Sequence, residues 1–227
     1  MRIRALAFDV FGTLVDWRSS VAEAFRRTKL ADDPEELAVD WRNRLWPMLG
    51  DVNRGARPWG NLDELHRAML DDLLDERGLT LPDDGRSELV QAWHQLDPWP
   101  DARPGLEALR AQQVTAALSN GHIAMLVDLA RHGELRFDCV ISAELAHVYK
   151  PQPEVYLTAT RLLGLQPDEL MLVAAHPIDL KGARNAGLRT AFIDRPLEYG
   201  PDSPPREDPD ADVSVSQLQE LATWLGR

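Results

Sequence analysis

Apolar residues follow two different periods along the chain. Residues 3–8 form a largely apolar stretch of strand length, which predicts a fully buried strand. Between residues 19 and 96, apolar positions recur three and four residues apart, which predicts amphipathic helices. These helices are expected at residues 19–29, 34–49, 62–77 and 82–96, with Gly78 as the stop signal of the third. The first strand is therefore followed by a purely helical region.

After residue 97 the pattern changes again. The proline-rich stretch 97–104 breaks helices and predicts a hinge. Strands are then predicted at residues 114–119, 138–142, 170–175 and 189–194, and helices at residues 105–112, 122–132, 153–163, 180–186 and 213–225. Such alternation is typical of right-handed βαβ units. We predict an α/β fold, a Rossmann-like parallel sheet flanked by helices, whose core domain (1–16 and 98–227) carries an inserted helical cap domain (17–97).

The segment before the last predicted helix contains an unusual number of prolines. Five of them fall between residues 195 and 212: Pro196, Pro201, Pro204, Pro205 and Pro209. Both a flap and a plain surface connection have this composition, and the second interpretation is favoured.

Composition limits the classes of function. The 227 residues carry a net charge of −12, which argues against nucleic acid as a partner because binding phosphates requires a basic face. The single Cys139 excludes an intramolecular disulfide framework and a cysteine metal cluster. No apolar stretch is long enough to span a membrane. These features predict a soluble cytoplasmic protein without a membrane partner.

Polar side chains stand at the ends of four predicted strands, where open parallel sheets bind their ligands. They are Asp9, Ser119 with Asn120, Lys150 and Asp179. Each has a simpler explanation by itself, since Asp caps turns and helices and Lys150 could reach the surface. The presence of such residues at all four strand ends favours a shared functional site over four separate explanations.

In order and spacing, the stretch from Asp9 to Thr13, together with Ser119-Asn120, Lys150 and Asp179, resembles the four motifs of the haloacid dehalogenase superfamily. Phosphatases of that superfamily carry a second Asp two residues after the first, as general acid and base, where this chain has Phe11. They also bind Mg²⁺ through further acids near the fourth motif, and here only Asp179 remains. The chain instead resembles the L-2-haloacid dehalogenase branch, which implies neither a metal nor another cofactor.

The resemblance implies roles for individual residues. Asp9 would attack Cα of a 2-haloalkanoate and form an aspartyl ester, which water then hydrolyses to a 2-hydroxyacid. Arg42 and Asn120 would stabilise the departing halide, and Val10 and Phe11 would contact the substrate. The remaining matching residues would hold the substrate, Asp9 or the attacking water: Thr13, Ser119, Lys150, Tyr156 and Asp179.

The chain also departs from this branch. Before Asp179 the better-known members have Ser-Ser-Asn and an aromatic, and this chain has Ala174-Ala175-His176-Pro177-Ile178. The sequence leaves His176 open as a hydrogen-bond donor, a base or a structural histidine. Ile178 in place of the aromatic predicts a different halide preference, with fluoroacetate and chloroacetate as open candidates. Trp59 is the predicted cap aromatic over the substrate, although packing within the cap would also explain it.

Three hypotheses follow: a haloacid dehalogenase acting on small anionic haloacids with water, a phosphatase-like hydrolase, and a catalytically silent binding module. The tryptophans of the cap region, Trp41, Trp46, Trp93 and Trp99, favour a homodimer because a small cap would not readily bury them all. Surface pairing or capping explains Asp16, Arg44 and His122, and neither His94 nor His147 is assigned a function.

Overall fold

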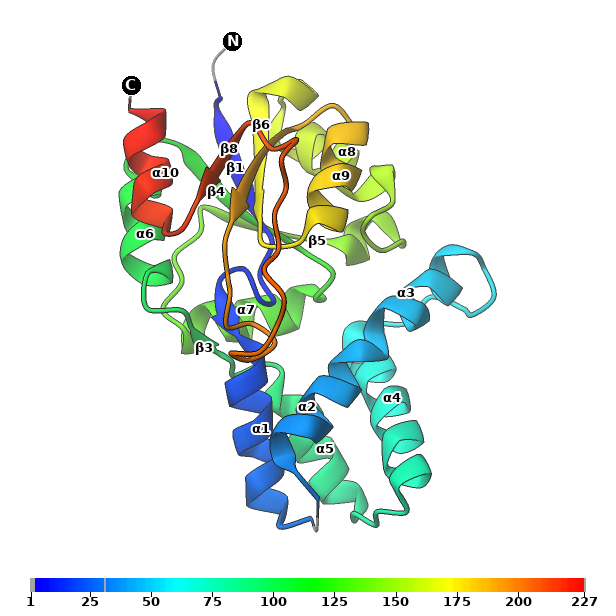
Figure 1. The fold of residues 1–227 in the computed structure, drawn as a ribbon. Coiled ribbons are helices and arrows are strands. Elements are labelled where there is room, and N and C mark those ends of the chain that lie inside the picture. The colour runs from blue at the N-terminus through cyan, green and yellow to red at the C-terminus, as the bar shows by residue number, and fades with distance from the viewer. Residues whose placement is uncertain (1–2, 31, 227) are drawn as a thin grey trace.

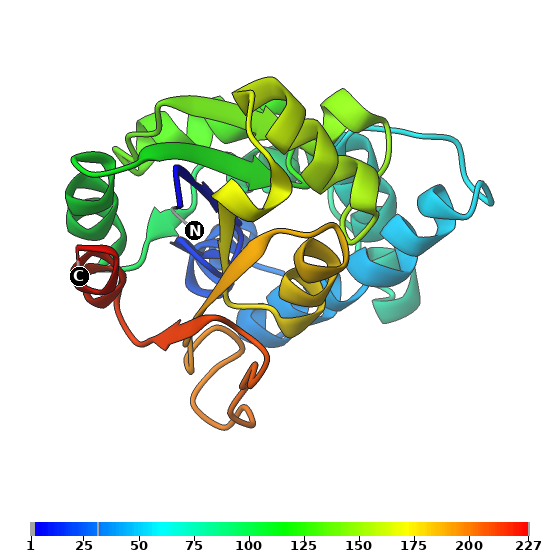
Figure 2. The ribbon, with the colours of Figure 1, turned by 90° about the horizontal axis from the view of Figure 1, so that it is seen from above.

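The computed structural model describes residues 3–30 and 32–226, and its centre is a six-stranded sheet with the order β5-β4-β1-β6-β7-β8. All neighbouring strands are parallel (Figures 1 and 2). The strands are β1 (Ala5–Phe8), β4 (Val114–Ser119), β5 (Cys139–Ser142), β6 (Leu170–Ala174), β7 (Arg189–Ile193) and β8 (Val213–Val215). The predicted α/β fold is confirmed. Within the apolar stretch at residues 3–8, strand pairing begins at Ala5, and Ile3 and Arg4 lie before the first paired residue.

Helices cover both faces of the sheet. Figure 1 shows α6 (Ala102–Arg110) and α10 (Leu218–Leu225) on one side, and α8 (Pro153–Leu163) and α9 (Pro177–Asn185) on the other. The remaining core helices are α7 (Ile123–His132) and two 3₁₀ turns, η1 (Ala143–Ala146) and η2 (Pro167–Glu169). Because both faces are covered, the central strands β1 and β6 are buried throughout, as their apolar sequences require.

Five helices lie between β1 and the rest of the core: α1 (Trp17–Thr28), α2 (Pro34–Asn43), α3 (Leu45–Asn53), α4 (Leu62–Arg77) and α5 (Asp83–Ala92). They stand beyond the carboxyl ends of the strands (Figure 1). The chain leaves and re-enters the core through a short antiparallel pair, β2 (Val15–Asp16) and β3 (Asp97–Pro98). From here on we call residues 17–96 the cap.

Local signals explain where the cap helices begin and end. Asp16 accepts a hydrogen bond from the backbone N–H of Ser19 at 3.1 Å and so caps α1, as predicted. Asn61 caps α4 in the same way, and Gly78 ends that helix in the left-handed conformation with a φ of 64°.

Prolines and a strand-like pattern explain three of the differences between the predicted and the observed helices. The helix predicted at 34–49 breaks at Arg44, because Pro47 has no N–H for the carbonyl of Asn43 and is tolerated only in the first turn of α3. For the same reason Pro104 lies in the first turn of α6, so this helix begins inside the predicted hinge. The helix predicted at 213–225 was wrong at its start, since Val213–Val215 alternates like a strand and pairs with β7.

Aromatic rings form the centre of the cap. Trp93 stacks on Trp17 at 6.3 Å between ring centroids and meets Trp41 edge-on at 5.4 Å. All three are fully buried within the protomer. The argument for a homodimer from unburied tryptophans therefore fails for Trp41 and Trp93.

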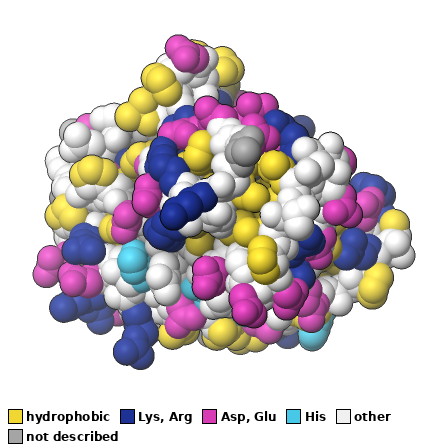
Figure 3. Space-filling model, turned by 90° about the horizontal axis from the view of Figure 1, so that it is seen from below, with side chains coloured by type: hydrophobic (Ala, Val, Ile, Leu, Met, Phe, Trp, Pro, Cys, Tyr) yellow, Lys and Arg dark blue, Asp and Glu magenta, His cyan; other side chains and the backbone are white. Residues whose placement is uncertain are grey.

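The outer face of the cap carries interspersed acidic and basic side chains (Figure 3). Arg77, for example, pairs with Asp32, Glu36 and Asp40, and Arg44 pairs with Glu76, as predicted for a surface residue. Within residues 3–30 and 32–226, no helix is both long and apolar enough to cross a membrane.

The packing of α6 on α10 generates a stability prediction. A Cβ added at Gly105 would lie 2.2 Å from the Cβ of Leu218, so Gly105→Ala must push the two helices apart. We expect the free energy of unfolding to fall by about 1–3 kcal/mol, outweighing the better helix propensity of alanine. Gly226→Ala is the control, because its nearest atom would be 3.5 Å away. Urea unfolding of both variants measures the difference, and equal stability would contradict the close packing.

Candidate active site

The carboxyl ends of the central strands and the inner face of the cap enclose one small cavity. The space free for solvent is about 20 Å³, room for roughly one water molecule. Core residues and cap residues line it together: Asp9, Phe11, Ser119, Asn120, Lys150, His176 and Asp179 from the core, and Arg42, Leu45, Trp46, Leu49 and Leu62 from the cap. The strand-end residues predicted from sequence therefore do converge.

Asp9, directly after β1, is held differently at its two carboxylate oxygens. Oδ2 accepts hydrogen bonds from the hydroxyl of Thr13 at 2.8 Å and from Nδ1 of His176 at 3.1 Å. Oδ1 has a single, longer contact of 3.4 Å with the ammonium of Lys150. Burial opposes ionisation, but Lys150 and His176 outweigh it and hold the pKa of Asp9 well below its usual range. Asp9 is a permanent carboxylate with one weakly engaged oxygen.

Thr13 acts as a relay to this carboxylate. Its hydroxyl oxygen accepts the backbone N–H of Ala175 at 3.0 Å, so its own hydrogen is directed to Asp9. The backbone N–H of Ala175, just after β6, therefore orients the Thr13 hydroxyl toward Asp9.

On the other side of Asp9, Lys150 donates to Asp179 Oδ2 at 2.8 Å. Tyr156 from α8 donates to Asp179 Oδ1 at 2.6 Å, so Tyr156 supports Asp179 and does not line the cavity. Burial disfavours the charged form of Asp179 and raises its pKa. Burial also opposes the charge of Lys150, but the carboxylates of Asp179 and Asp9 outweigh it and raise the pKa of the ammonium. Lys150 occupies the position between Asp9 and Asp179 where a divalent cation would need free oxygens, so this donor set suits magnesium poorly.

His176 lies between two carboxylates, Asp9 and Glu198. Its Nε2 is 2.9 Å from Glu198 Oε1, and both partners are buried. A neutral imidazole would turn a lone pair toward one of them in either tautomer. Despite the opposing effect of burial, Glu198 and Asp9 raise the pKa of His176 to about 9. His176 is therefore an imidazolium that donates to Asp9.

The prediction of a mere surface connection at residues 195–212 was wrong, because this loop delivers Glu198. The Glu198 side chain is fully buried and also accepts from the indole N–H of Trp17 at 3.0 Å and from Arg206. Burial would raise its pKa, but His176 and Arg206 bring it down to about 2. The loop is fixed at its start by Arg195, which donates to the backbone oxygen of Thr13 at 2.9 Å.

No local sequence pattern marks Glu198, but its close approach to the turn after β1 requires a glycine at position 12. Gly12 has a φ of +81°, and a Cβ there would lie 2.1 Å from Glu198 Oε1. The turn after Asp9 therefore needs glycine both for its backbone and for the approach of the loop.

Arg42 of α2 brings a positive charge to the cap side of the cavity. Its guanidinium lies 5.5–6.0 Å from the ring centroids of Phe11, Trp17 and Trp93. Arg42 is buried, and no carboxylate in the described part of the chain forms an ion pair with it. A buried cation in aromatic surroundings favours binding of an anion.

Ser119 and Asn120, at the end of β4, are partly engaged by the backbone. Ser119 Oγ accepts the N–H of Gly121 at 3.3 Å, and Asn120 Oδ1 accepts the N–H of Lys150 at 2.8 Å. The second bond fixes the Asn120 amide and leaves its NH₂ group as a donor beside the cavity.

The structure does not bring three of the predicted contact residues to the cavity. Ile178 is 50% exposed, because it follows Pro177 in the first turn of α9 and faces solvent. Trp59 stacks on Tyr149 at 6.5 Å, so packing is its role. Val10 is buried but is not part of the lining, because adjacent residues of an extended segment point to opposite sides.

Comparison with known proteins now adds to this geometry. The model of the haloacid dehalogenase-like hydrolases matches residues 3–187. The chain is 34% identical over 231 residues to (S)-2-haloacid dehalogenase 1 of Pseudomonas sp. (strain CBS-3), covering 99% of this chain and 97% of that protein.

Solved structures agree with the sequence match. The L-2-haloacid dehalogenase PA0810 superposes with a TM-score of 0.94 at 46% identity, covering 99% of each chain. The defluorinating L-2-haloacid dehalogenase Rha0230 does so with 0.93 at 40% identity, covering 99% of this chain and 96% of that one. The L-2-haloacid dehalogenase of Xanthobacter autotrophicus with covalently bound chloropropionic acid gives 0.86 at 28%, covering 99% and 98%.

The raised pKa of His176 predicts how stability depends on pH. Because the folded pKa lies above the ordinary 6.5, the stabilisation is fully present below pH 6.5 and is lost as pH rises through about 9. The free energy of unfolding should fall by about 3 kcal/mol across this window. The free energy of unfolding of His176→Asn, which lacks the titrating group, should depend less on pH when both proteins are unfolded in urea from pH 6 to 10. Parallel curves would contradict the charged state assigned to His176.

Proposed function

This chain belongs to the haloacid dehalogenase-like hydrolases, and we propose that it hydrolyses short 2-haloalkanoic acids to 2-hydroxyacids through an ester on Asp9. The observation that carries the proposal is that an ionised Asp9 and the buried cation of Arg42 line the same small cavity, where Arg42 forms no ion pair with a carboxylate of the described residues. Phe11 cannot donate a proton, which disfavours the phosphatase alternative. The enzyme acts on carbon–halide bonds.

The hydrogen bonds of Asp9 distinguish its oxygens chemically. Oδ1, with its one contact of 3.4 Å, is the nucleophile, and Oδ2 is retained by Thr13 and His176. Attack of Oδ1 on Cα forms the C–O bond while the carbon–halogen bond breaks, and the halide leaves with the electron pair. Arg42 and the Asn120 NH₂ group, which line the cavity, would stabilise this negative charge. Attack from behind inverts the carbon, so an L-2-haloacid gives a D-2-hydroxyacid.

Ester formation turns Oδ2 into a carbonyl oxygen, and its two donors then become an oxyanion hole. Water adds to Cγ of Asp9, the negative charge moves to Oδ2, and Thr13 and the imidazolium of His176 stabilise it. Asp179 takes one proton of the water and passes it to Oδ1 as the Cγ–Oδ1 bond breaks and the hydroxyacid leaves, and the second proton is released to solvent. Asp9 regains a carboxylate that contains one oxygen from solvent. Of the three roles that the sequence leaves open for His176, the proposed mechanism uses that of a hydrogen-bond donor.

The small cavity supports a preference for small substrates. With about 20 Å³ of free space, the cap must move before any haloacid can bind, and Leu45 and Leu49 limit the length of the chain that fits after closure. The similarity to a defluorinating enzyme makes fluoroacetate part of this proposal. We also retain as proposals a homodimer and a cytoplasmic location, the latter in keeping with the free thiol of Cys139.

Halide release tests the reaction directly. In the presence of a chelator, the wild-type protein should release halide from L-2-chloropropionate, chloroacetate and fluoroacetate. Release from each should be faster than from 2-bromohexanoate. Asp9→Asn should abolish release, because an amide is a poor nucleophile. Halide is measured by ion chromatography, with phosphate release from an aryl phosphate assayed in parallel. Thermal stabilisation by a haloacid without any halide release would instead favour the binding module.

Loss of the oxyanion hole should slow the second step selectively. Thr13→Val should reduce ester hydrolysis about 10²–10³-fold, so that ester accumulates, while Thr13→Ser restores turnover. Mass spectrometry of quenched protein detects the alkylated Asp9. After one turnover of the wild type in ¹⁸O-water, the label should be on Asp9 and not in the product. Labelled product beside unlabelled Asp9 would overturn the ester mechanism.

A further inference from the structure

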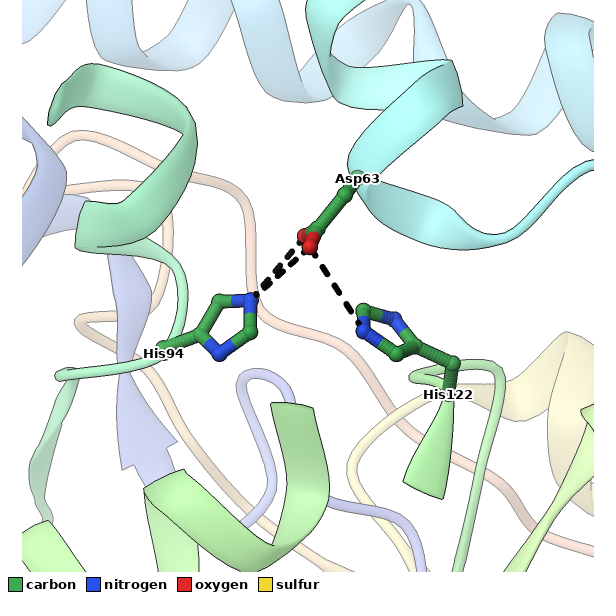
Figure 4. Close-up of side chains that lie close together, drawn as sticks. All are labelled: Asp63, His94 and His122. Atoms are coloured by element: carbon green, nitrogen blue, oxygen red, sulfur yellow. Dashed lines mark hydrogen bonds and ion pairs between the residues drawn. The ribbon is translucent and has the colours of Figure 1, made fainter. Parts of the chain in front are cut away.

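Three side chains converge outside the cavity, at the junction of cap and core (Figure 4). Asp63 comes from the first turn of α4, His94 follows α5, and His122 precedes α7. Nε2 of His94 lies 3.0 Å from Asp63 Oδ1, and Nε2 of His122 lies 3.5 Å from Asp63 Oδ2. One ligand atom from each residue lies within 4.8 Å of the others. Within residues 3–30 and 32–226, no other three His, Cys, Asp or Glu residues meet in this way.

Neither capping nor surface pairing accounts for this cluster. His122 stands at the N-cap position of α7 but its side chain makes no capping bond, and its Nδ1 is buried without a partner. Both histidines are buried, and neither lines the catalytic cavity. The interpretation of His122 by surface pairing or capping is therefore wrong, because its side chain caps no helix and its pairing with Asp63 is buried on the His122 side.

The donor set is one that transition metals prefer. Two imidazole nitrogens and one carboxylate oxygen suit Zn²⁺, with solvent as the fourth ligand. The other nitrogen of His94, Nδ1, lies 2.8 Å from Asp128 Oδ2, and such a carboxylate orients a metal-binding imidazole and increases its basicity.

Charge also fits a divalent cation. Both nitrogens of His94 face carboxylates, Asp128 and Asp63, so without metal a hydrogen on Nε2 bridges to Asp63. A metal ion would replace the proton on Nε2, which is released to solvent. Together with Asp63 and Asp128 a Zn²⁺ ion makes the site neutral.

We propose that Asp63, His94 and His122 form a zinc site that locks the cap onto the core. Asp63 and His94 belong to the cap and His122 to the core, so the metal would cross-link the two. Because the closed cavity has room for about one water molecule, the locked enzyme could not admit substrate. Zinc is then an inhibitor and plays no part in the chemistry at Asp9. This regulatory role rests on the proposed dehalogenase function, whereas the metal site itself does not.

Metal binding is tested first, without reference to activity. Calorimetry of chelator-treated full-length protein with ZnCl₂ should show one tight site, and Co²⁺ should give the visible absorption of tetrahedral coordination. His94→Asn and His122→Asn should each abolish both signals, and Asp128→Asn should weaken binding about ten- to a hundredfold. His132→Asn is the matched control, because His132 lies on α7 and pairs with Asp97 away from the cluster. Binding that survives in both ligand variants would overturn the site.

Inhibition is tested separately with chloroacetate. Zinc should stop halide release by the wild type and the His132→Asn variant, and should leave the rate of His122→Asn at its own metal-free value. Equal inhibition of His122→Asn, or zinc binding with no loss of rate, would overturn the lock. If the metal-free wild type releases no halide, the proposed function fails, and calorimetry still decides whether the metal site exists.

Discussion

A row of five buried charges, alternating in sign, holds this site together. It runs from Asp179 through Lys150, Asp9 and His176 to Glu198, with distances of 2.8–3.4 Å between successive partners. Each charge alone would be costly to bury, and each is stabilised by its neighbours. The five residues come from four separate segments of the core, because His176 and Asp179 both stand at the start of α9. The geometry of Asp9 thus depends on the whole sheet and on the loop after β7.

In the proposed reaction, this arrangement explains how a weak nucleophile can act on carbon. The cations keep Asp9 ionised, but they engage its two oxygens unequally, so one oxygen stays available for attack. The same donors that hold the second oxygen at rest are in place for the oxyanion of the next step. Preorganised donors of this kind need no rearrangement between the two steps.

The cap contributes the remaining charge and the control of access. Arg42 reaches the cavity from α2 and is surrounded by Phe11, Trp17 and Trp93, so its position depends on the aromatic centre of the cap. The Asp63, His94 and His122 cluster lies at the boundary of the same two parts. Chemistry and closure are therefore linked through the contact between cap and core.

The sequence by itself determined the layered fold, the helical cap and most of the strand-end residues, because apolar periodicity and the carboxyl ends of parallel strands are local features. Only the tertiary structure decided the partners of His176 and the direction in which Ile178 and Trp59 point. Glu198 lies 22 residues from His176 in a proline-rich loop, and no local pattern indicates that its carboxylate is buried. Likewise, Asp63 and His94 of the cap meet His122 of the core only in the folded chain. Long-range pairing of charges leaves no period in a sequence, so it could be found only in the folded chain.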